Sequence, residues 1–230
     1  MHNFLFGIYP YIATAVLIIG SISRYERDPF TWKSSSSQLL RRKQLIMGSI
    51  LFHVGILTIF AGHMIGLLTP IWIFDALGVS HGAKQLLAII AGGGAGAMML
   101  VGGSMLLHRR LTDPRIRATS TFADTGILIL LMAQLLLGLG TIFASLQHLD
   151  GHEMTKFMSW AQGIMTFEAN AADHIADVAL VFKIHLTLGL TIFLIFPFTR
   201  LVHMLSVPLR YLTRPGYQIV RSRRQSTGRK

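Results

Sequence analysis

Five long apolar runs, separated by polar connections, dominate the pattern of hydrophobic and polar positions along the chain. A helix rises about 1.5 Å per residue, so about 20 apolar residues cross the hydrocarbon core of a bilayer. The pattern therefore predicts an all-α, polytopic membrane protein with five transmembrane helices. We place these helices at about residues 4–22, 45–68, 85–107, 125–147 and 178–204.

The composition of the 230 residues agrees with this class. Hydrophobic residues make up 52% of the chain, charged residues make up 13%, and the mean hydropathy is +0.54, outside the usual range of soluble domains. The chain has no cysteine, which excludes disulfides, iron–sulfur clusters and zinc–thiolate sites built from its own side chains. Histidine, with ten copies, is then the main candidate metal ligand.

Basic residues are concentrated in three polar segments. Of the 21 Lys and Arg residues, six lie between the first and second runs, four between the third and fourth, and seven in the tail, 205–230. Loops rich in Lys and Arg stay on the cytoplasmic side of a membrane. We therefore expect a single membrane domain, 1–230, with its N-terminus outside and a basic cytoplasmic tail. Because this topology accounts for the net charge of +11, we expect no nucleic acid partner.

The connection at 148–177 is acidic and is expected on the outer side. Within it, four large apolar residues recur at helical spacing and predict a short amphipathic helix on the membrane surface. Such a helix would either clip the bundle together or roof a pocket open to lipid. The four residues are Phe157, Trp160, Ile164 and Phe167.

Small and polar residues inside the runs predict how the helices pack. Gly48, Gly55, Gly62 and Gly66 share one side of the second run, which is expected to face a neighbour. The third run is rich in glycine, which favours either close helix packing or room for a flat cofactor. Gln134, in the fourth run, is expected to form an interhelical hydrogen bond.

Two histidines occur in the second run and two in the fifth. Ionisable groups at membrane depth are costly and usually functional. Because the two helices run in opposite directions, His53 and His203 share the inner depth, while His63 and His185 share the outer depth. Two such pairs of neutral imidazoles suit two stacked bis-histidine haems. A hydrogen-bonded packing role or a proton relay is the alternative for each histidine.

The spacing of the four histidines does not match between the two helices. His53 and His63 are separated by about 15 Å of helical rise, whereas His185 and His203 are separated by about 27 Å and share one face if the helix is continuous. Tilted macrocycles, or a bend at Pro197, would be needed to hold two haems. Other basic residues have two possible roles, as interfacial or topology markers or as partners of haem propionates or a docking subunit. They are Lys183, Arg115 and Arg117.

Long segments of the chain resemble the gamma, cytochrome b subunit of membrane-bound respiratory nitrate reductase. The resemblance covers nearly the whole chain. It is carried by IYPYIA at 8–13, SSQLL at 36–40, LFHVGIL at 51–57, GHMIGLLTP at 62–70, RRLTDPRIRAT at 109–119, SWAQ at 159–162, and KIHLTLG and FPFTRLVHMLSVPLRYLTR near the end.

The resemblance implies a five-helix anchor in the bacterial cytoplasmic (inner) membrane that carries two b-type haems. Such a subunit oxidises quinol from the membrane pool near the outer face. It passes the electrons inward to an iron–sulfur beta subunit and a molybdenum-containing alpha subunit, which reduces nitrate.

Carried over by position, the resemblance also implies the site residues. His53 and His203 are the implied ligands of the inner haem, and His63 and His185 those of the outer haem. Lys84, followed by Gln85, resembles a lysine near the family's quinol site, where an ammonium group can hydrogen-bond a quinone oxygen.

Besides an inert anchor with no redox part, two other functions remain open from the sequence. One is the haem anchor of another molybdenum reductase or of a heterodisulfide-reductase-like complex, since nothing in this chain identifies the terminal electron acceptor. The other is a haem-free transporter or proton channel with a histidine relay.

Overall fold

The computed structural model describes residues 1–32, 40–147 and 149–206, and their regular structure is entirely helical. In the names below, η marks 3-10 or π helices. The elements are η1 (Phe4–Ile8), α1 (Tyr9–Arg27), η2 (Pro29–Thr31), α2 (Arg42–Leu68), α3 (Ile71–Ala76), α4 (His81–Thr112), α5 (Pro114–Ala118), α6 (Phe122–Ser145), α7 (His152–Met165), η3 (Ala171–Ile175), α8 (Leu180–Ile195), η4 (Phe196–Phe198) and η5 (Arg200–Leu205).

Five helical segments of the described chain are long and apolar enough to cross a membrane, which confirms the all-helical, polytopic class. They are Phe4–Arg27, Arg42–Leu68, His81–Thr112, Phe122–Ser145 and Leu180–Phe198. Several of them extend beyond the apolar runs because polar caps, and not hydropathy, set their ends. Ser80 accepts a hydrogen bond from the Ala83 amide, and Thr121 and Asp124 form a capping box.

The fifth predicted helix, 178–204, is wrong in its bounds. The α-helix ends at Ile195, a single 3-10 turn follows at η4, and a separate 3-10 helix, η5, carries the chain to Leu205. Pro197 causes the break because proline lacks an N–H group and its ring clashes with the preceding turn. The predicted tail, 205–230, lies outside the described residues from 207 onward.

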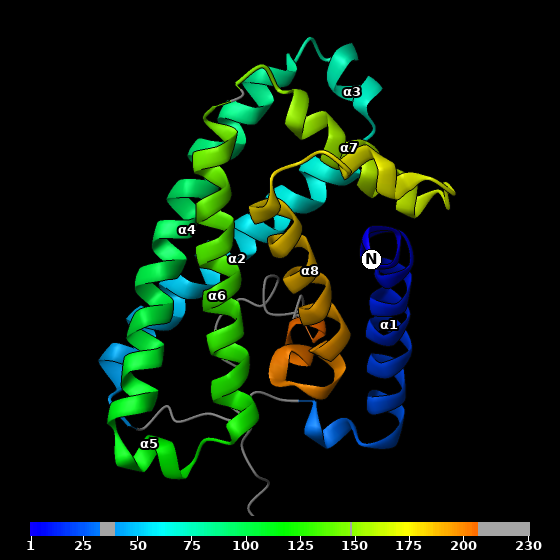
Figure 1. Ribbon diagram of the computed structural model, residues 1–230. Helices are drawn as coiled ribbons and strands as arrows, with labels where there is room; N and C mark the ends of the chain where they lie inside the picture. The colour runs from blue at the N-terminus through cyan, green and yellow to red at the C-terminus, as the bar shows by residue number, and fades with distance from the viewer. Residues whose placement is uncertain (33–39, 148, 207–230) are drawn as a thin grey trace, which may run out of the picture.

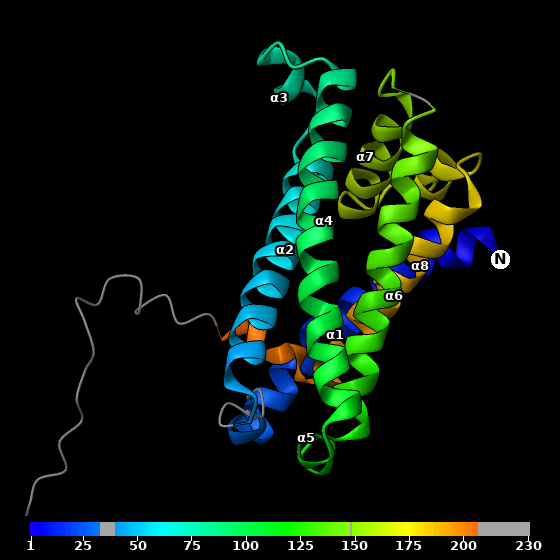
Figure 2. The same ribbon diagram turned by 90° about the vertical axis from the view of Figure 1, so that its left-hand side faces the viewer.

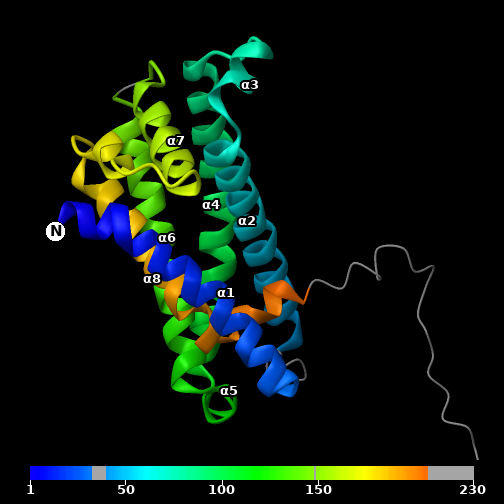
Figure 3. The same cartoon turned by 90° about the vertical axis from the view of Figure 1, so that its right-hand side faces the viewer.

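The long helices form a bundle with two distinct ends (Figure 1). We name them the α7 end, where α3 and α7 lie, and the α5 end, where α5 lies. Helices α2 and α6 run toward the α7 end, whereas α1, α4 and α8 run toward the α5 end (Figures 1 and 2). Helix α1 lies along α8 (Figure 3), and α6 packs between α4 and α8.

Helices α2 and α4 pack closely against each other through small residues. A Cβ atom added to Gly55 would lie 2.6 Å from the Ala95 carbonyl oxygen, and one on Gly48 would lie 3.2 Å from the Gly102 carbonyl oxygen. The prediction of a packing face is therefore confirmed for this half of α2. It is wrong for Gly62 and Gly66, where an added Cβ would meet nothing within 4 Å.

The amphipathic helix predicted in the acidic connection is present as α7. Its Phe157 and Ile164 pack on a core cluster that contains Trp160, Phe6 and Ile175. The Trp160 indole N–H donates to the Phe6 carbonyl oxygen at 2.9 Å, so α7 is fastened to the N-terminal segment. Only the placement of Phe167 on this helix was wrong. It follows the helix with a positive φ of 61° and stacks on Tyr11.

Candidate functional site

The structure brings the four histidines together in the two predicted pairs. The imidazole rings of His53 on α2 and His203 on η5 have their centres 6.3 Å apart. The rings of His63 on α2 and His185 on α8 also have their centres 6.3 Å apart. One pair lies toward each end of the bundle, because His63 is ten residues nearer than His53 to the α7 end of α2.

The spacing within each pair suits one metal ion between two imidazoles. A metal–nitrogen bond is about 2 Å long and the ring centre lies about 1 Å further, so opposed ligands have ring centres about 6 Å apart. In the described part of the chain, no group of three or more His, Asp or Glu side chains is arranged around one metal position. Two facing imidazoles without further protein ligands would therefore suit an iron ion whose other ligands come from a haem.

Three of the four imidazoles are oriented by a carbonyl group on the preceding turn. The Nδ1 atom of His53 lies 2.7 Å from the Ser49 carbonyl oxygen, and that of His63 lies 2.8 Å from the Ile59 carbonyl oxygen. On η5, the Nδ1 atom of His203 is 2.5 Å from the Arg200 carbonyl oxygen. With Nδ1–H donating to a carbonyl, Nε2 keeps its lone pair for a metal, as ligating histidines usually do.

His185 is held differently, by the neighbouring helix α6. The Gln134 side-chain amide donates to the His185 carbonyl oxygen at 3.1 Å, which confirms the predicted interhelical hydrogen bond. The ring occupies space left by Gly138, since a Cβ there would lie 3.0 Å from the His185 Cε1 atom. The His185 Nδ1 atom is buried and has no hydrogen-bond partner among the described residues.

The break at Pro197 removes the spacing mismatch between the two helices. His185 and His203 do not share one face of a continuous helix, so that prediction is wrong, because the α-helix ends before His203. After the break, η5 turns away from the axis of α8 (Figure 3) and presents His203 to His53. The bend that the haem hypothesis required at Pro197 is thus present.

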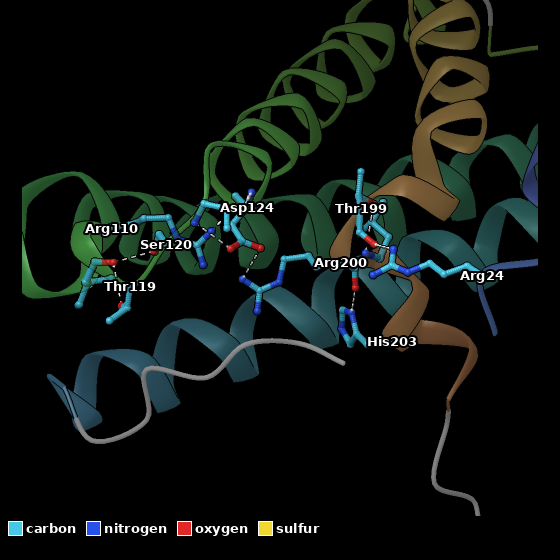
Figure 4. A network of polar contacts seen from close by, with 11 residues as sticks. Arg24, Arg110, Thr119, Ser120, Asp124, Thr199, Arg200 and His203 are labelled. Atoms are coloured by element: carbon cyan, nitrogen blue, oxygen red, sulfur yellow. Dashed lines mark hydrogen bonds and ion pairs between the residues drawn. The ribbon is translucent and has the colours of Figure 1, made fainter. Parts of the chain in front are cut away.

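An arginine on α1 holds the broken segment in place. Arg24 Nη1 donates to the carbonyl oxygens of Pro197 and Thr199, both at 2.7 Å, as Figure 4 shows. These carbonyl groups lie where the helix is interrupted, and a buried unpaired carbonyl is costly. From the sequence, Arg24 is only one of the six basic residues between the first and second apolar runs. Its partners are 173 and 175 residues away in the chain, so no local pattern revealed this role.

A second network ties η5 to helix α6. Arg200 Nη1 lies 3.5 Å from the Asp124 carboxylate, and Arg110 Nη1 donates to the Asp124 carbonyl oxygen at 2.6 Å (Figure 4). The same carboxylate accepts the Thr121 N–H at the start of α6. The segment that carries His203 is therefore anchored from both α1 and α6.

The described residues fit a haem at each pair. A bis-histidine haem would need two facing imidazoles with space beside them, and His53 and His63 are exposed on α2. Helix α2 packs mainly on α4, whereas α8 packs mainly on α1 and α6. The paired imidazoles, and not the backbones of the helices that carry them, therefore approach each other across the bundle.

Lys84, on the first turns of α4, is buried at the α7 end with a side chain that is 6% exposed. Its ammonium group donates to the Gly66 carbonyl oxygen at 2.9 Å and to the Met158 sulfur at 2.6 Å, and lies 3.7 Å from the centre of the Phe74 ring. No carboxylate is among these contacts. A sulfur is a weak acceptor, so this ammonium can still bind a ligand oxygen.

Lys84 lies close to the His63–His185 pair along α2. Gly66, which accepts its hydrogen bond, is three residues beyond His63, or about 4.5 Å along the helix axis. The open positions at Gly62 and Gly66 lie on the same stretch of α2. An added Cβ at either position would meet no atom within 4 Å, so the surface of α2 is open at these two glycines.

Of the remaining candidate residues, Lys183 lies near the start of α8, and Arg115 and Arg117 lie on α5. The Lys183 ammonium group donates to the Ala176 carbonyl oxygen at 2.7 Å. Arg115 and Arg117 belong to α5, which Asp113 caps. At the α7 end, Lys156 forms ion pairs with Glu153 at 3.0 Å and Asp177 at 2.8 Å.

Fold and site together define a membrane protein with five spanning helices and two facing histidine pairs at different depths. The family model described as nitrate reductase gamma subunit matches residues 2–223, and the chain belongs to that family.

Similar proteins cover almost the same length. The chain is 52% identical to respiratory nitrate reductase 1 gamma chain of Escherichia coli (strain K12) over 97% of its own length and 98% of that protein. It is 52% identical to respiratory nitrate reductase 2 gamma chain of the same organism, again over 97% and 98%. It is 40% identical to nitrate reductase gamma chain of Bacillus subtilis (strain 168), over 95% and 97%.

Proposed function

We propose that this chain is the di-haem cytochrome b membrane subunit of a respiratory nitrate reductase and that it oxidises quinol. His53 and His203 hold one haem b toward the α5 end, and His63 and His185 hold a second toward the α7 end. The observation that carries the proposal is the equal spacing of the two pairs, with ring centres 6.3 Å apart in each. Family membership supports an electron-transport role for the pairs.

The distribution of charge supports an orientation with the α5 end in the cytoplasm. The described part of this end is rich in arginine, on α1, the start of α2, the end of α4, and α5. The α7 end carries acidic residues such as Glu153, Glu168 and Asp177. Excess Lys and Arg marks cytoplasmic segments. The membrane is then the bacterial cytoplasmic (inner) membrane, with the N-terminus outside and the C-terminus inside.

Lys84 is the proposed quinol-binding group at the outer face. Its ammonium group donates a hydrogen bond to a quinol oxygen, beside the His63–His185 pair and the open stretch at Gly62 and Gly66. The Phe74 ring and Met158 hold the ammonium in place from other sides. Keeping this cation among apolar groups makes its hydrogen bond to a ligand stronger than it would be in water.

The partners follow from the names of the relatives. A gamma chain of nitrate reductase associates with other subunits, which we propose to be an iron–sulfur beta subunit and a molybdenum-containing alpha subunit at the α5 end. Bound haem supplies one-electron transfer between the two-electron donor quinol and these subunits. Protons from quinol leave at the α7 end, while electrons leave at the α5 end.

Spectroscopy of histidine variants tests the proposal. The purified wild-type complex is expected to show two b-type haems that a quinol analogue reduces. His63→Ala should lose the haem at the α7 end only, and His53→Ala the haem at the α5 end only. His174→Ala is the matched control. The His174 Nε2 atom lies 3.1 Å from the Glu168 carboxylate, and His174 belongs to neither pair.

Two results would overturn the proposal. A wild-type complex without a b-type spectrum would remove the haems altogether. Retention of both haems in His63→Ala, with the complex intact, would remove that ligand and its pairing with His185.

A further inference from the structure

Two buried polar atoms without partners lie on side chains that touch each other. They are the Nδ1 atom of His185 and the Oε1 atom of Gln134, and neither has a hydrogen-bond partner among the described residues. Buried polar atoms in proteins are rarely left unpaired. The Nδ1 atom of His185 can carry a proton and donate a hydrogen bond, whereas the Oε1 atom of Gln134 can only accept a hydrogen bond.

The orientation of the Gln134 amide is fixed by its other contact. Its Nε2 atom donates to the His185 carbonyl oxygen at 3.1 Å and lies 3.4 Å from the ring Nε2 atom. Only an amide nitrogen can donate to a carbonyl, so the unpaired atom of Gln134 is its oxygen. This oxygen remains beside the imidazole as an acceptor.

Two glycines, Gly138 on α6 and Gly189 on α8, let the imidazole and the amide fit between these helices. A Cβ on Gly138 would lie 3.0 Å from His185 Cε1, and one on Gly189 would lie 3.1 Å from Gln134 Nε2. Any larger residue at either position would occupy the space that these groups now fill.

His185 also differs from the other three paired histidines. Each of those directs Nδ1 to a backbone carbonyl of its own preceding turn, at 2.5–2.8 Å. A histidine that ligates a metal through Nε2 carries its proton on Nδ1, and that proton needs an acceptor. For His185 the acceptor at hand is on another helix.

We propose that Gln134 is a positioning residue for His185, with its side-chain oxygen accepting the Nδ1 proton when Nε2 faces the metal. The inference rests on the proposed haem at the His63–His185 pair. A hydrogen bond from Nδ1–H makes the imidazole a more basic ligand, which favours the oxidised iron and lowers its reduction potential. Gln134 thus sets the potential of the outer haem and leaves the inner one unaffected.

Redox titration of the purified complex tests this role. Gln134→Leu and Gln134→Met remove the acceptor but keep an apolar side chain of similar size. In both variants, the reduction potential of the outer haem is expected to rise. Its affinity for the protein is expected to fall by about 10-fold or more. Gln134→Glu supplies a stronger acceptor and is expected to lower the same potential. A purely structural role would not produce shifts of opposite sign.

Gln44→Leu is the matched control. The Gln44 amide donates to the Met105 carbonyl oxygen at 3.3 Å between α2 and α4, and no paired histidine takes part. Its removal should leave the outer-haem potential unchanged. An outer-haem potential that stays at the wild-type value in the Leu, Met and Glu variants that assemble overturns the inference. A wild-type complex with no outer haem would instead overturn the proposed function, so the two failures are distinguishable.

Discussion

Gly20 on α1 lies directly against the ring of Pro197, and a Cβ atom on Gly20 would come within 2.9 Å of the Pro197 Cγ atom. The Pro197 side chain is fully buried, so its ring has little space to move away. Glycine at position 20 therefore lets α1 approach the break between α8 and η5. This contact bears on the position of His203, six residues further along the chain.

Gly20→Val is expected to displace the break and weaken the site formed by His53 and His203. Inserting a side chain into a packed contact shifts the backbone at a typical cost of about 1–3 kcal/mol. The expected result is loss or weakening of one haem, with the other retained, measured by the reduced-minus-oxidised spectrum.

Gly126→Val is the control for this variant, since a Cβ on Gly126 of α6 meets nothing within 4 Å. Both substitutions replace glycine by valine within a helix, so they share the same change in helix propensity. Equal haem content in the two variants would contradict the role given to the contact with Pro197.

Arg24→Gln is expected to destabilise the same segment without touching a histidine. The variant removes a charged donor from two carbonyl oxygens at the break. Hydrogen bonds to charged groups are worth about 1.5–3 kcal/mol each, so loss of both corresponds to about 3–6 kcal/mol of lost stability. A lower thermal midpoint of the detergent-purified protein would show this. Arg27→Gln, at an exposed position in the last turn of α1, should have little effect.

The membrane class and the histidine pairing could be predicted because they depend on coarse properties of the sequence. Apolar length identifies a spanning helix, and helix direction alone decides which histidines share a depth. Five spanning segments and both ring contacts are found in the structure. The roles of these histidines as ligands remain a prediction.

The break at Pro197 and its supports could not be placed from the local pattern. The residues around His203 are apolar, so hydropathy extended the helix to 204, although Pro197 marked a possible bend. Whether a proline bends or ends a helix depends on what takes up the freed carbonyl groups. Here that group is Arg24, on a helix at the other end of the sequence. The open space at Gly62 and Gly66 likewise depends on how α2 and α4 pack, which glycine spacing does not specify.

The ion pairs at Lys156 should make the attachment of α7 insensitive to pH near neutrality. The hydrogen bond from Lys156 lowers the pKa of Asp177, while hydrogen bonds to Asp177 and Glu153 raise the pKa of Lys156. The Asp177 contribution is present above the ordinary aspartate pKa of 3.8 and is lost as pH falls through its lowered pKa. The Lys156 contribution is present below 10.5 and is lost as pH rises through its raised pKa.

The measurement is the difference in thermal midpoint between a His152→Gln variant and the same variant with Lys156→Met added, as a function of pH. Both proteins carry His152→Gln because the His152 side chain interacts electrostatically with Asp177. The difference is expected to stay constant between about pH 5 and 9 and to shrink below about pH 4. A difference that changes steeply around pH 6 to 7 would contradict the assignment to these two groups.

Lys84→Met is expected to slow quinol oxidation while leaving both haems bound. The substitution keeps an unbranched side chain beside Phe74 but removes the ammonium group that reaches Gly66. Loss of one hydrogen bond from a charged donor, about 1.5–3 kcal/mol, corresponds to about a 10- to 100-fold loss in quinol-driven haem reduction. Lys156→Met removes a lysine at the same end of the bundle, but one that pairs with carboxylates, and should keep wild-type rates. Wild-type quinol oxidation in Lys84→Met would show that this ammonium does not contact the substrate.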